Sequence, residues 1–226
     1  MTPLVLLHGL STTPEVWASM RTERETLTPE LPAFESMDAI AAALLEKLPP
    51  RFALAGFSLG GYVALAMLAN APQRIERLAL ISTSAGADTP EASAYRKRLI
   101  AMAQSGRYQA IDAKMAPFLV HPRRVDEAAI IALRQRMAAI YGIERYVAHQ
   151  RASSARPDRH ALLETFAAPA LVAVGREDRI TPLALSEEMA RRLPAAKLVV
   201  LEQCGHLSPV EAPEALGVEL RRVLDS

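Results

Sequence analysis

Five short and almost unbroken apolar runs recur along the chain, separated by longer amphipathic stretches. The runs cover residues 4–7, 52–55, 78–81, 171–174 and 198–201. A strand buried on both faces has this continuous apolar pattern, whereas a half-exposed strand alternates apolar and polar positions. Strands of this kind, alternating with helices, predict an α/β fold in which helices cover both faces of a mostly parallel sheet.

The stretches between the runs have helical spacing and recognisable starting residues. In 36–48, apolar side chains recur every three or four residues, and Ser36 stands at the N-cap position. Another helix is predicted to begin at Thr181-Pro182, where a capping hydroxyl precedes a proline at the first helical position. These helices fit between the predicted strands.

Two regions depart from the alternation. Residues 25–35 stand where another strand is due, but two prolines and three acids weaken the pattern, so we predict a weak edge strand. Residues 86–165 have no strand pattern and several helical ones, over 91–105, 107–116, 126–141 and 143–154. We therefore predict that 86–165 is a helical insertion and that 1–85 and 166–226 form the core.

The motif Gly56-Phe57-Ser58-Leu59-Gly60 directly follows one apolar run and opens an apolar helix that extends through Asn70. A serine in a tight strand-to-helix turn needs glycines two residues before and after it, because strand and helix approach closely there. The start of the helix places backbone N–H groups beside the hydroxyl, where they favour a developing negative charge. A purely structural turn with Ser58 as a cap is the alternative, and the flanking strand and helix favour a nucleophile.

A serine nucleophile needs an adjacent base, and the chain has five histidines, at positions 8, 121, 149, 160 and 206. His206 follows the last apolar run, at the carboxyl edge of the predicted sheet, where ligand chemistry gathers in α/β proteins. His8 also follows a run, but Gly9 and the loop after it indicate a loop-ordering role. The other three histidines fall in 86–165, and we predict that they are solvated or wall residues.

The acid that orients the histidine is expected just after the run 171–174. Glu177 and Asp178 both stand there, and neighbouring side chains in a turn point apart, so only one of them can face His206. A helix-capping role for Asp178 is disfavoured because Thr181 already occupies the capping place. The residues alone leave the choice between the two carboxylates open.

Together these segments resemble the α/β-hydrolase superfamily over nearly the whole chain. The matching pieces are Leu7-His8-Gly9-Leu10 with Trp17 downstream, and residues 56–61, 175–182 and 205–208. Small bacterial esterases, enol-lactonases and pimeloyl-ester hydrolases are the most similar groups. One departure is that the family's Asp-x-x-Gly-x-Gly-x-Ser loop is missing, with 25–35 in its place.

This resemblance implies an α/β-hydrolase fold in which 86–165 forms a helical cap over the site. It favours Asp178 over Glu177 as the triad acid, with the chain order serine, acid, histidine. It also implies that the backbone N–H groups of Leu10 and Leu59 form the oxyanion hole. Trp17 and Phe57, which stand beside the oxyanion motifs, are candidates for substrate contact.

These residues predict a cofactor-independent serine hydrolase that cleaves a small-molecule carboxylic ester. In this prediction Ser58 forms an acyl-enzyme, His206 is the general base and acid, and Asp178 orients His206. Two alternatives stay open: a lyase or carbon–carbon bond hydrolase that uses the same triad on a small diketone-type metabolite, and a non-catalytic small-molecule receptor that keeps the triad for binding. No metal or cofactor is predicted.

Composition limits the partners and the cellular compartment that we expect for the protein, but it does not identify the substrate. The 226 residues carry a net charge of +1, which indicates neither a nucleic acid nor an anionic membrane as partner. The single cysteine fits a reducing compartment, and no apolar run approaches the ~20 residues of a membrane helix, so a cytoplasmic protein is expected. No oligomeric state can be inferred.

Charge is distributed unevenly along the chain. Residues 86–165 contain 13 Lys or Arg and 8 Asp or Glu, a formal charge of +5, against −4 for the remainder. This excess fits either the attraction of carboxylated substrates or ordinary solvated helix surfaces. Apolar residues of the same segment fit either an acyl pocket or packing between helices; they are Met102, Met115, Met137 and Tyr141.

Overall fold

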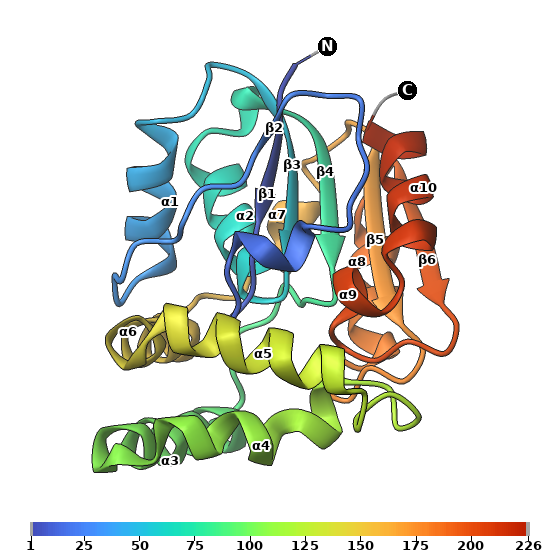
Figure 1. The fold of residues 1–226 in the computed structure, drawn as a ribbon. Helices are drawn as coiled ribbons and strands as arrows, with labels where there is room; N and C mark the ends of the chain where they lie inside the picture. The colour runs from blue at the N-terminus through green and yellow to red at the C-terminus, as the bar shows by residue number, and fades with distance from the viewer. Residues whose placement is uncertain (1, 225–226) are drawn as a thin grey trace.

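A six-stranded parallel sheet forms the centre of the molecule in the computed structural model, which describes residues 2–224 (Figure 1). The strand order is β2-β1-β3-β4-β5-β6, and every pairing is parallel. The strands are β1 (Leu4–Leu7), β2 (Thr26–Leu27), β3 (Phe52–Phe57), β4 (Ile75–Ile81), β5 (Ala170–Gly175) and β6 (Ala196–Leu201). The predicted parallel sheet is confirmed, including the weak strand in 25–35, which is the edge strand β2.

Helices cover both faces of the sheet, because alternate residues of each strand point to opposite sides. Val5 and Leu7 of β1 belong to the core beneath α1 (Met37–Leu45), α2 (Leu59–Asn70) and α8 (Leu183–Arg192). Leu4 and Leu6 belong to the core beneath α10 (Pro213–Leu224), which follows the short helix α9 (Ser208–Glu211). The strands are therefore buried on two sides, which explains their continuous apolar runs.

The chain between β4 and β5 is helical, and we call residues 86–165 the helical segment. It contains α3 (Pro90–Met102), α4 (Tyr108–Leu119), α5 (Ala128–Tyr141), α6 (Ile143–Ala155) and α7 (His160–Leu163). Between α3 and α4 the backbone leaves helical geometry at Ser105 and Gly106, and Gly106 adopts a φ of +80°. Figure 1 shows α3 to α6 beyond the arrowheads of the strands, facing the carboxyl edge of the sheet. The division into core and cap domain stays a prediction.

Ion pairs connect the helical segment to acids of the core. Arg145 and Arg151 of α6 pair with two acids of the loop after β2 (Glu30 and Glu35), and Arg136 of α5 pairs with Glu15. Exposed pairs of this kind stabilise a protein by only about 0–1 kcal/mol each. They nevertheless show where part of the basic excess of 86–165 lies: it faces acids of the core.

Two predicted helix starts have different outcomes. Ser36 caps α1, since its side chain accepts a hydrogen bond from the amide of Ala39. The prediction for Thr181 is wrong: α8 has Pro182 at its N-cap, no side chain caps it, and the Thr181 hydroxyl instead donates to Asp178 at 2.7 Å. The ionised Asp178 carboxylate is a strong acceptor for this hydroxyl, and the helix starts one residue later than predicted.

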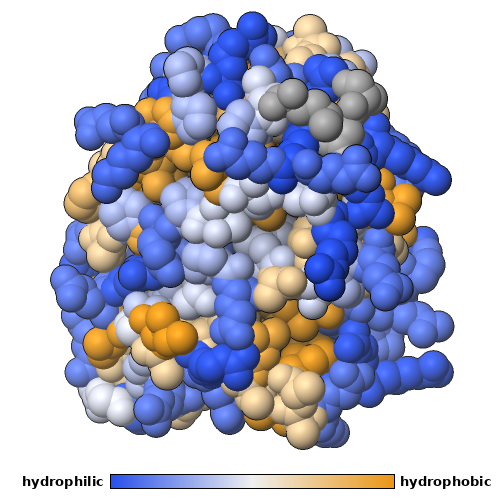
Figure 2. All heavy atoms as spheres, turned by 45° about the horizontal axis from the view of Figure 1, so that its top comes forward, coloured by the Kyte–Doolittle hydropathy of each residue, from blue (hydrophilic) through white to orange (hydrophobic). Residues whose placement is uncertain are grey.

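One face of the molecule is drawn as a space-filling surface in Figure 2. On the face drawn in Figure 2, hydrophilic side chains predominate, and apolar ones form small separate groups. Within residues 2–224, no helix has the length and apolar character that crossing a membrane requires.

Candidate active site

Ser58 sits in a strained turn between β3 and α2. Its backbone has φ +52° and ψ −115°, a conformation that residues with a side chain rarely adopt. The turn is held by hydrogen bonds from the Ser58 amide to the Ile81 carbonyl (2.9 Å) and from the Thr83 hydroxyl to the Ser58 carbonyl (2.8 Å). The strain is thus balanced by contacts with β4 and the loop that follows it.

Glycines make this turn possible because the backbone segments touch. A Cβ atom on Gly56 would lie 2.4 Å from the carbonyl oxygen of Gly60. A Cβ on Gly60 would lie 2.4 Å from the carbonyl oxygen of Leu7 in β1. No other residue fits at either position without displacing backbone.

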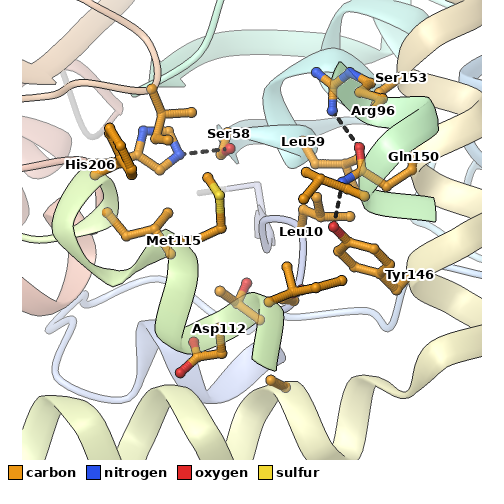
Figure 3. Close-up of a pocket in the computed structure, with 18 of the residues that line it drawn as sticks. Leu10, Ser58, Leu59, Arg96, Asp112, Met115, Tyr146, Gln150, Ser153 and His206 are labelled. Carbon is orange, nitrogen blue, oxygen red and sulfur yellow. Dashed lines mark hydrogen bonds between the residues drawn. The ribbon is translucent and has the colours of Figure 1, made fainter. Parts of the chain in front are cut away.

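The hydroxyl of Ser58 lies against the imidazole of His206. The Ser58 Oγ and His206 Nε2 atoms are 2.9 Å apart, within hydrogen-bond distance (Figure 3). His206 comes from the loop between β6 and α9, and its ring packs on Phe57 with 5.3 Å between ring centroids. Two loops far apart in sequence therefore meet at the carboxyl edge of the sheet, as predicted.

Asp178 holds the other side of the same imidazole. Its Oδ2 lies 2.8 Å from His206 Nδ1, and its side chain is fully buried. The carboxylate also accepts hydrogen bonds from the amides of Ile180 and Thr181 and from the Thr181 hydroxyl. With Nδ1–H donating to Asp178, Nε2 is left as the acceptor for the Ser58 hydroxyl.

The environment of Asp178 favours its charged form. Burial by itself raises the pKa of this carboxyl, but the attraction and hydrogen bond of His206 and the hydrogen bonds of Thr181 outweigh burial and lower the pKa below its ordinary value. Asp178 is therefore an anion at neutral pH, and it can stabilise a positive charge on His206.

The side chains of the neighbouring acids Glu177 and Asp178 have different hydrogen-bond partners. Glu177 turns away from His206, and its Oε2 accepts a hydrogen bond from the amide of Cys204 at 3.0 Å. Asp178 alone of the pair contacts the imidazole. Of the two acids that the local sequence left open, Asp178 is thus the one that faces the imidazole, and its role as the triad acid stays a prediction.

The loop with the predicted oxyanion residue Leu10 is tied down on both sides. The Gly9 amide donates to the Thr12 hydroxyl at 2.8 Å, and His8 Nδ1 lies 3.0 Å from the Gly9 carbonyl. The completely buried His8 ring also accepts from the amide of Leu31, at 3.4 Å. His8 therefore orders this loop and does not face Ser58, in agreement with the role inferred from its sequence position.

Leu59 is the first residue of α2, so its amide has no carbonyl partner one turn earlier in the helix. Leu10 and Leu59 both line the cavity that contains Ser58 and His206. Their roles as oxyanion donors remain predictions.

The cavity beside Ser58 has a volume of about 560 Å³, within the range of small-molecule sites. Core residues such as Phe57, Ile180 and Leu207 line one side. The helical segment lines the rest with residues that are mostly apolar; they include Tyr95, Leu99, Tyr108, Ile111, Met115, Phe118, Leu119 and Ala138. Of the four apolar residues of 86–165 singled out in the sequence, Met115 reaches the cavity, and Met137 and Tyr141 are buried in packing.

The two predicted substrate-contact residues have different positions. Phe57 lines the cavity, whereas Trp17 is buried behind it, edge-on to the Phe57 ring at 6.3 Å between centroids. Trp17 is not among the described residues that border the cavity. The structure therefore brings Phe57, but not Trp17, to the site, because the indole fills the core beneath α10.

His149 differs most from its sequence prediction. It is completely buried and does not border the cavity: it binds the Tyr141 hydroxyl through Nδ1 and the Pro32 carbonyl through Nε2, the latter at 2.7 Å. Burial lowers the pKa of His149 to about 4, so the ring is neutral at physiological pH. The expectation of a solvated or wall residue is wrong here, because the side chain joins α5 and α6 to the loop after β2.

Two polar residues that support His206 were not recognised in the sequence. Thr181 holds the Asp178 carboxylate, as described above. The Glu211 carboxylate accepts hydrogen bonds from the amides of Gly205 and Leu207, the two neighbours of His206, at 3.1 Å each. The Glu211 signal in sequence is weak, since it is one acid near a short helix; only the folded loop shows its partners.

Metal binding has no obvious location in the described chain. Within residues 2–224, no group of three or more His, Cys, Asp or Glu side chains is arranged to hold an ion.

Comparisons with known proteins identify the family of this chain. A model of a family described as the alpha/beta hydrolase family matches residues 4–217. The chain belongs to the alpha/beta hydrolase family. A relative from Aromatoleum aromaticum, a pimeloyl-[acyl-carrier protein] methyl ester esterase, is 31% identical over 98% of this chain and 97% of its own. One of the same name from Nitrosomonas europaea is 27% identical over 93% of this chain and 91% of its own.

Solved structures of other alpha/beta hydrolases superpose on nearly the entire molecule. A thermophilic esterase from Thermogutta terrifontis, with malate bound, has a TM-score of 0.92 and 29% identity, and covers 100% of this chain and 90% of its own. The enol-lactonase from Burkholderia xenovorans has a TM-score of 0.87 over 100% of this chain and 92% of its own. At 22% identity, the latter shows the shared fold only.

Proposed function

We propose that this chain is a carboxylic ester hydrolase in which Ser58, His206 and Asp178 act as the catalytic triad. The class of activity is supported by the family and by the esterase relatives. The observation that carries the triad is the continuous chain of hydrogen bonds from Ser58 Oγ to His206 to Asp178, beside a cavity of small-molecule size.

In the first step Ser58 Oγ attacks the ester carbonyl carbon, and its proton passes to His206 Nε2. The imidazolium that forms is stabilised by the Asp178 carboxylate, which stays ionised. The amides of Leu10 and Leu59 donate hydrogen bonds to the oxyanion. Donors of this kind contribute about 10²–10³-fold each when they are fixed in advance.

In the second step the tetrahedral intermediate collapses. His206 Nε2–H protonates the leaving alkoxide, so that an alcohol departs and an acyl ester on Ser58 remains. The same nitrogen then accepts a proton from water, which attacks the acyl carbon and releases the acid. Ser58 and neutral His206 are regenerated, and the overall reaction consumes one water.

The helical segment acts as a cap in this proposal. Residues of α3 to α6 form much of the cavity wall, so a substrate on Ser58 is enclosed between them and the core. Enclosure excludes bulk water and strengthens the hydrogen bonds at the oxyanion. Phe57, which touches both the cavity and His206, is the proposed substrate contact from the core.

The substrate class is a small-molecule ester. The relatives named above act on a methyl ester of an acyl group, and the mostly apolar cavity wall is suited to an acyl chain. A cytoplasmic location is also proposed, supported by the lone, buried Cys204, which has no cysteine partner for a disulfide.

The proposal is tested by measuring hydrolysis of short-chain p-nitrophenyl esters with Ser58→Ala. We expect a loss of about 10⁶-fold in kcat with an unchanged fold, because a triad acts as a unit. Ser105→Ala is a matched control, since this serine is exposed at the break between α3 and α4 and bonds only locally. Turnover of a vinylogous diketone in preference to esters would instead support carbon–carbon bond hydrolysis.

A further inference from the structure

A polar cluster occupies the part of the cavity wall opposite His206. The guanidinium of Arg96 in α3 donates to the side-chain oxygen of Gln150 in α6 at 2.7 Å, and the Gln150 amide donates to the Tyr146 hydroxyl at 2.7 Å. All three residues border the cavity that contains Ser58. Figure 3 shows them across the cavity from His206, with the apolar side chains of Leu10 and Leu59 lying between.

The charges behind this cluster do not balance. Arg96 Nε lies 2.6 Å from Asp88 Oδ2, and Arg156 binds the other oxygen of the same carboxylate. Asp88 and Arg156 are buried, with side chains 3% and 9% exposed, and the other contacts of Arg156 are the Ser153 carbonyl and the ring of Tyr62. The Arg96 side chain is 19% exposed. Two guanidinium groups, both largely shielded from solvent, therefore share one carboxylate, which leaves one positive charge without an anion of its own.

A second arginine of the cavity wall provides a contrast. Arg134 of α5 is 4% exposed and pairs with its own carboxylate, Asp112, at 2.8 Å. That pair is neutral as a unit. Among the wall residues of the helical segment, the excess charge thus lies on the side that Arg96 occupies; Arg179, which also borders the cavity, comes from the core and is exposed.

Donor groups of the cluster remain available to a ligand. The Tyr146 hydroxyl accepts from Gln150, so its own proton is free to donate. The Nη2 group of Arg96 has only a long contact to Asp88, at 3.4 Å. A planar guanidinium edge beside a hydroxyl donor matches a carboxylate, and a single excess charge matches a single anionic group.

We propose that Arg96, Tyr146 and Gln150 bind a carboxylate that the substrate carries at the end remote from the ester. We call these three residues the Arg96 subsite. The inference rests on the proposed function, because it places the ester at Ser58 and the carboxylate across the cavity. The substrate class is an ester whose acyl or alcohol part ends in a carboxylate, with an apolar spacer that passes Leu10 and Leu59.

The test compares two matched pairs of substrates over a series of chain lengths. The acyl arm sets half-esters of dicarboxylic acids, as monomethyl esters, against methyl esters of monocarboxylic acids. The alcohol arm sets acetate esters of ω-hydroxycarboxylic acids against acetates of simple alcohols. In each arm, the readout is the kcat/KM of the carboxylate-terminated substrate divided by the kcat/KM of the methyl-terminated one. The arm with the higher ratio shows whether the acyl part or the alcohol part of the substrate carries the carboxylate.

We expect Arg96→Gln to lower this ratio by about 10–100-fold in that arm, the effect of losing one charged hydrogen-bond donor. The substitution leaves Asp88 paired one-to-one with Arg156, so no buried acid is orphaned. Arg136→Gln is the matched control: it removes the same charge from an exposed site of α5, and the ratio should not change. An unchanged ratio in Arg96→Gln, or an equal fall in both variants, would overturn the proposal.

Binding provides a readout that does not depend on turnover. Adipate, a dicarboxylate that resembles the product of a half-ester, should raise the melting temperature of Ser58→Ala and not that of Ser58→Ala with Arg96→Gln. Equal shifts in both proteins would contradict the subsite. If the wild-type protein cleaves neither kind of ester, the proposed function is wrong. If it cleaves methyl-terminated esters, but neither the kcat/KM ratio nor the adipate shift in melting temperature depends on Arg96, only the proposed subsite is wrong.

Discussion

The sheet core and the helical segment contribute to the same cavity by different physical means. In the core, Ser58, Asp178 and His206 each follow a strand, so the geometry of the sheet brings their loops to one edge. In the helical segment, the wall residues are brought together by packing among α3 to α6 and by contacts with the core. In the proposed function the core therefore provides the reaction chemistry, and the helical segment selects the molecules that reach it.

The junction between the core and the helical segment combines apolar packing with polar contacts. Buried apolar side chains pack the sheet against its helices. The helical segment meets the core through buried apolar side chains as well, such as Val120, Ile130 and Met137. It adds peripheral ion pairs and a buried polar contact between His149 and the Pro32 carbonyl. Substitutions in the core site should thus change the rate of reaction, whereas substitutions at this junction should change stability.

The largest expected effect on kcat distinguishes the two adjacent acids of the core, Asp178 and Glu177. Asp178→Asn should lower kcat by about 10⁴-fold, because an amide cannot hold the imidazole in the tautomer that accepts the Ser58 proton. Glu177→Gln should lower kcat by less than about threefold, since Gln keeps an acceptor for the Cys204 amide. Steady-state ester hydrolysis of both variants measures this. Comparable losses in the two proteins would mean that Glu177 shares the role of Asp178.

A smaller effect, on stability, is expected at the junction. The pKa of His149 is lowered by burial to about 4 in the folded protein, against an ordinary value near 6.5. Between these values the unfolded chain takes up a proton that the folded chain does not, so the free energy of unfolding falls as the pH falls. The expected loss from this residue between pH 8 and pH 5 is about 2 kcal/mol.

His149→Gln removes this dependence while keeping a donor for the Pro32 carbonyl. The variant should be about 1 kcal/mol less stable at pH 8, through loss of the Tyr141 contact, but its stability should fall less steeply toward pH 5. Urea unfolding at both pH values provides the measurement. His8 and Arg145, which also face His149, are present in both proteins. Parallel pH dependences in wild type and variant would show that His149 does not titrate as described.

The features that the sequence predicts correctly lie mainly in the core, and those that it does not predict lie mainly in supporting contacts between distant segments. The strands, the edge position of β2 and the turn at Ser58 are local features, because each depends on burial pattern or on glycine spacing within a few residues. The placement of His206 follows from one further rule, that parallel strands end at one edge. These features could be predicted, and the structure has them.

The supporting contacts could not be predicted, because their partners are distant in sequence. Thr181 has the pattern of a helix cap, and only the folded loop shows that Asp178 attracts its hydroxyl. His149 has the pattern of a surface helix, and its burial depends on the loop at Pro32. The same holds for Arg96, whose lack of a full counter-charge emerges only when Asp88 and Arg156 are seen together.

The charge asymmetry of the sequence has two sources in the structure. Several basic residues of the helical segment meet acids on the core, such as Glu30 and Glu35, and so belong to the junction. The Arg96 side of the cavity holds a separate excess, in which two largely shielded guanidinium groups share the Asp88 carboxylate. Counting charges along the chain could not separate a junction from a binding site, because both contribute with the same sign.

Labelling with a fluorophosphonate probe tests the central claim most directly, because such probes form a covalent bond only with an activated serine. The wild-type protein should take up one equivalent of probe, and mass spectrometry of its peptides should locate the adduct on Ser58. His206→Gln should abolish labelling, because the base that activates the hydroxyl is lost. An adduct on any other serine, or full labelling of the His206 variant, would contradict the account.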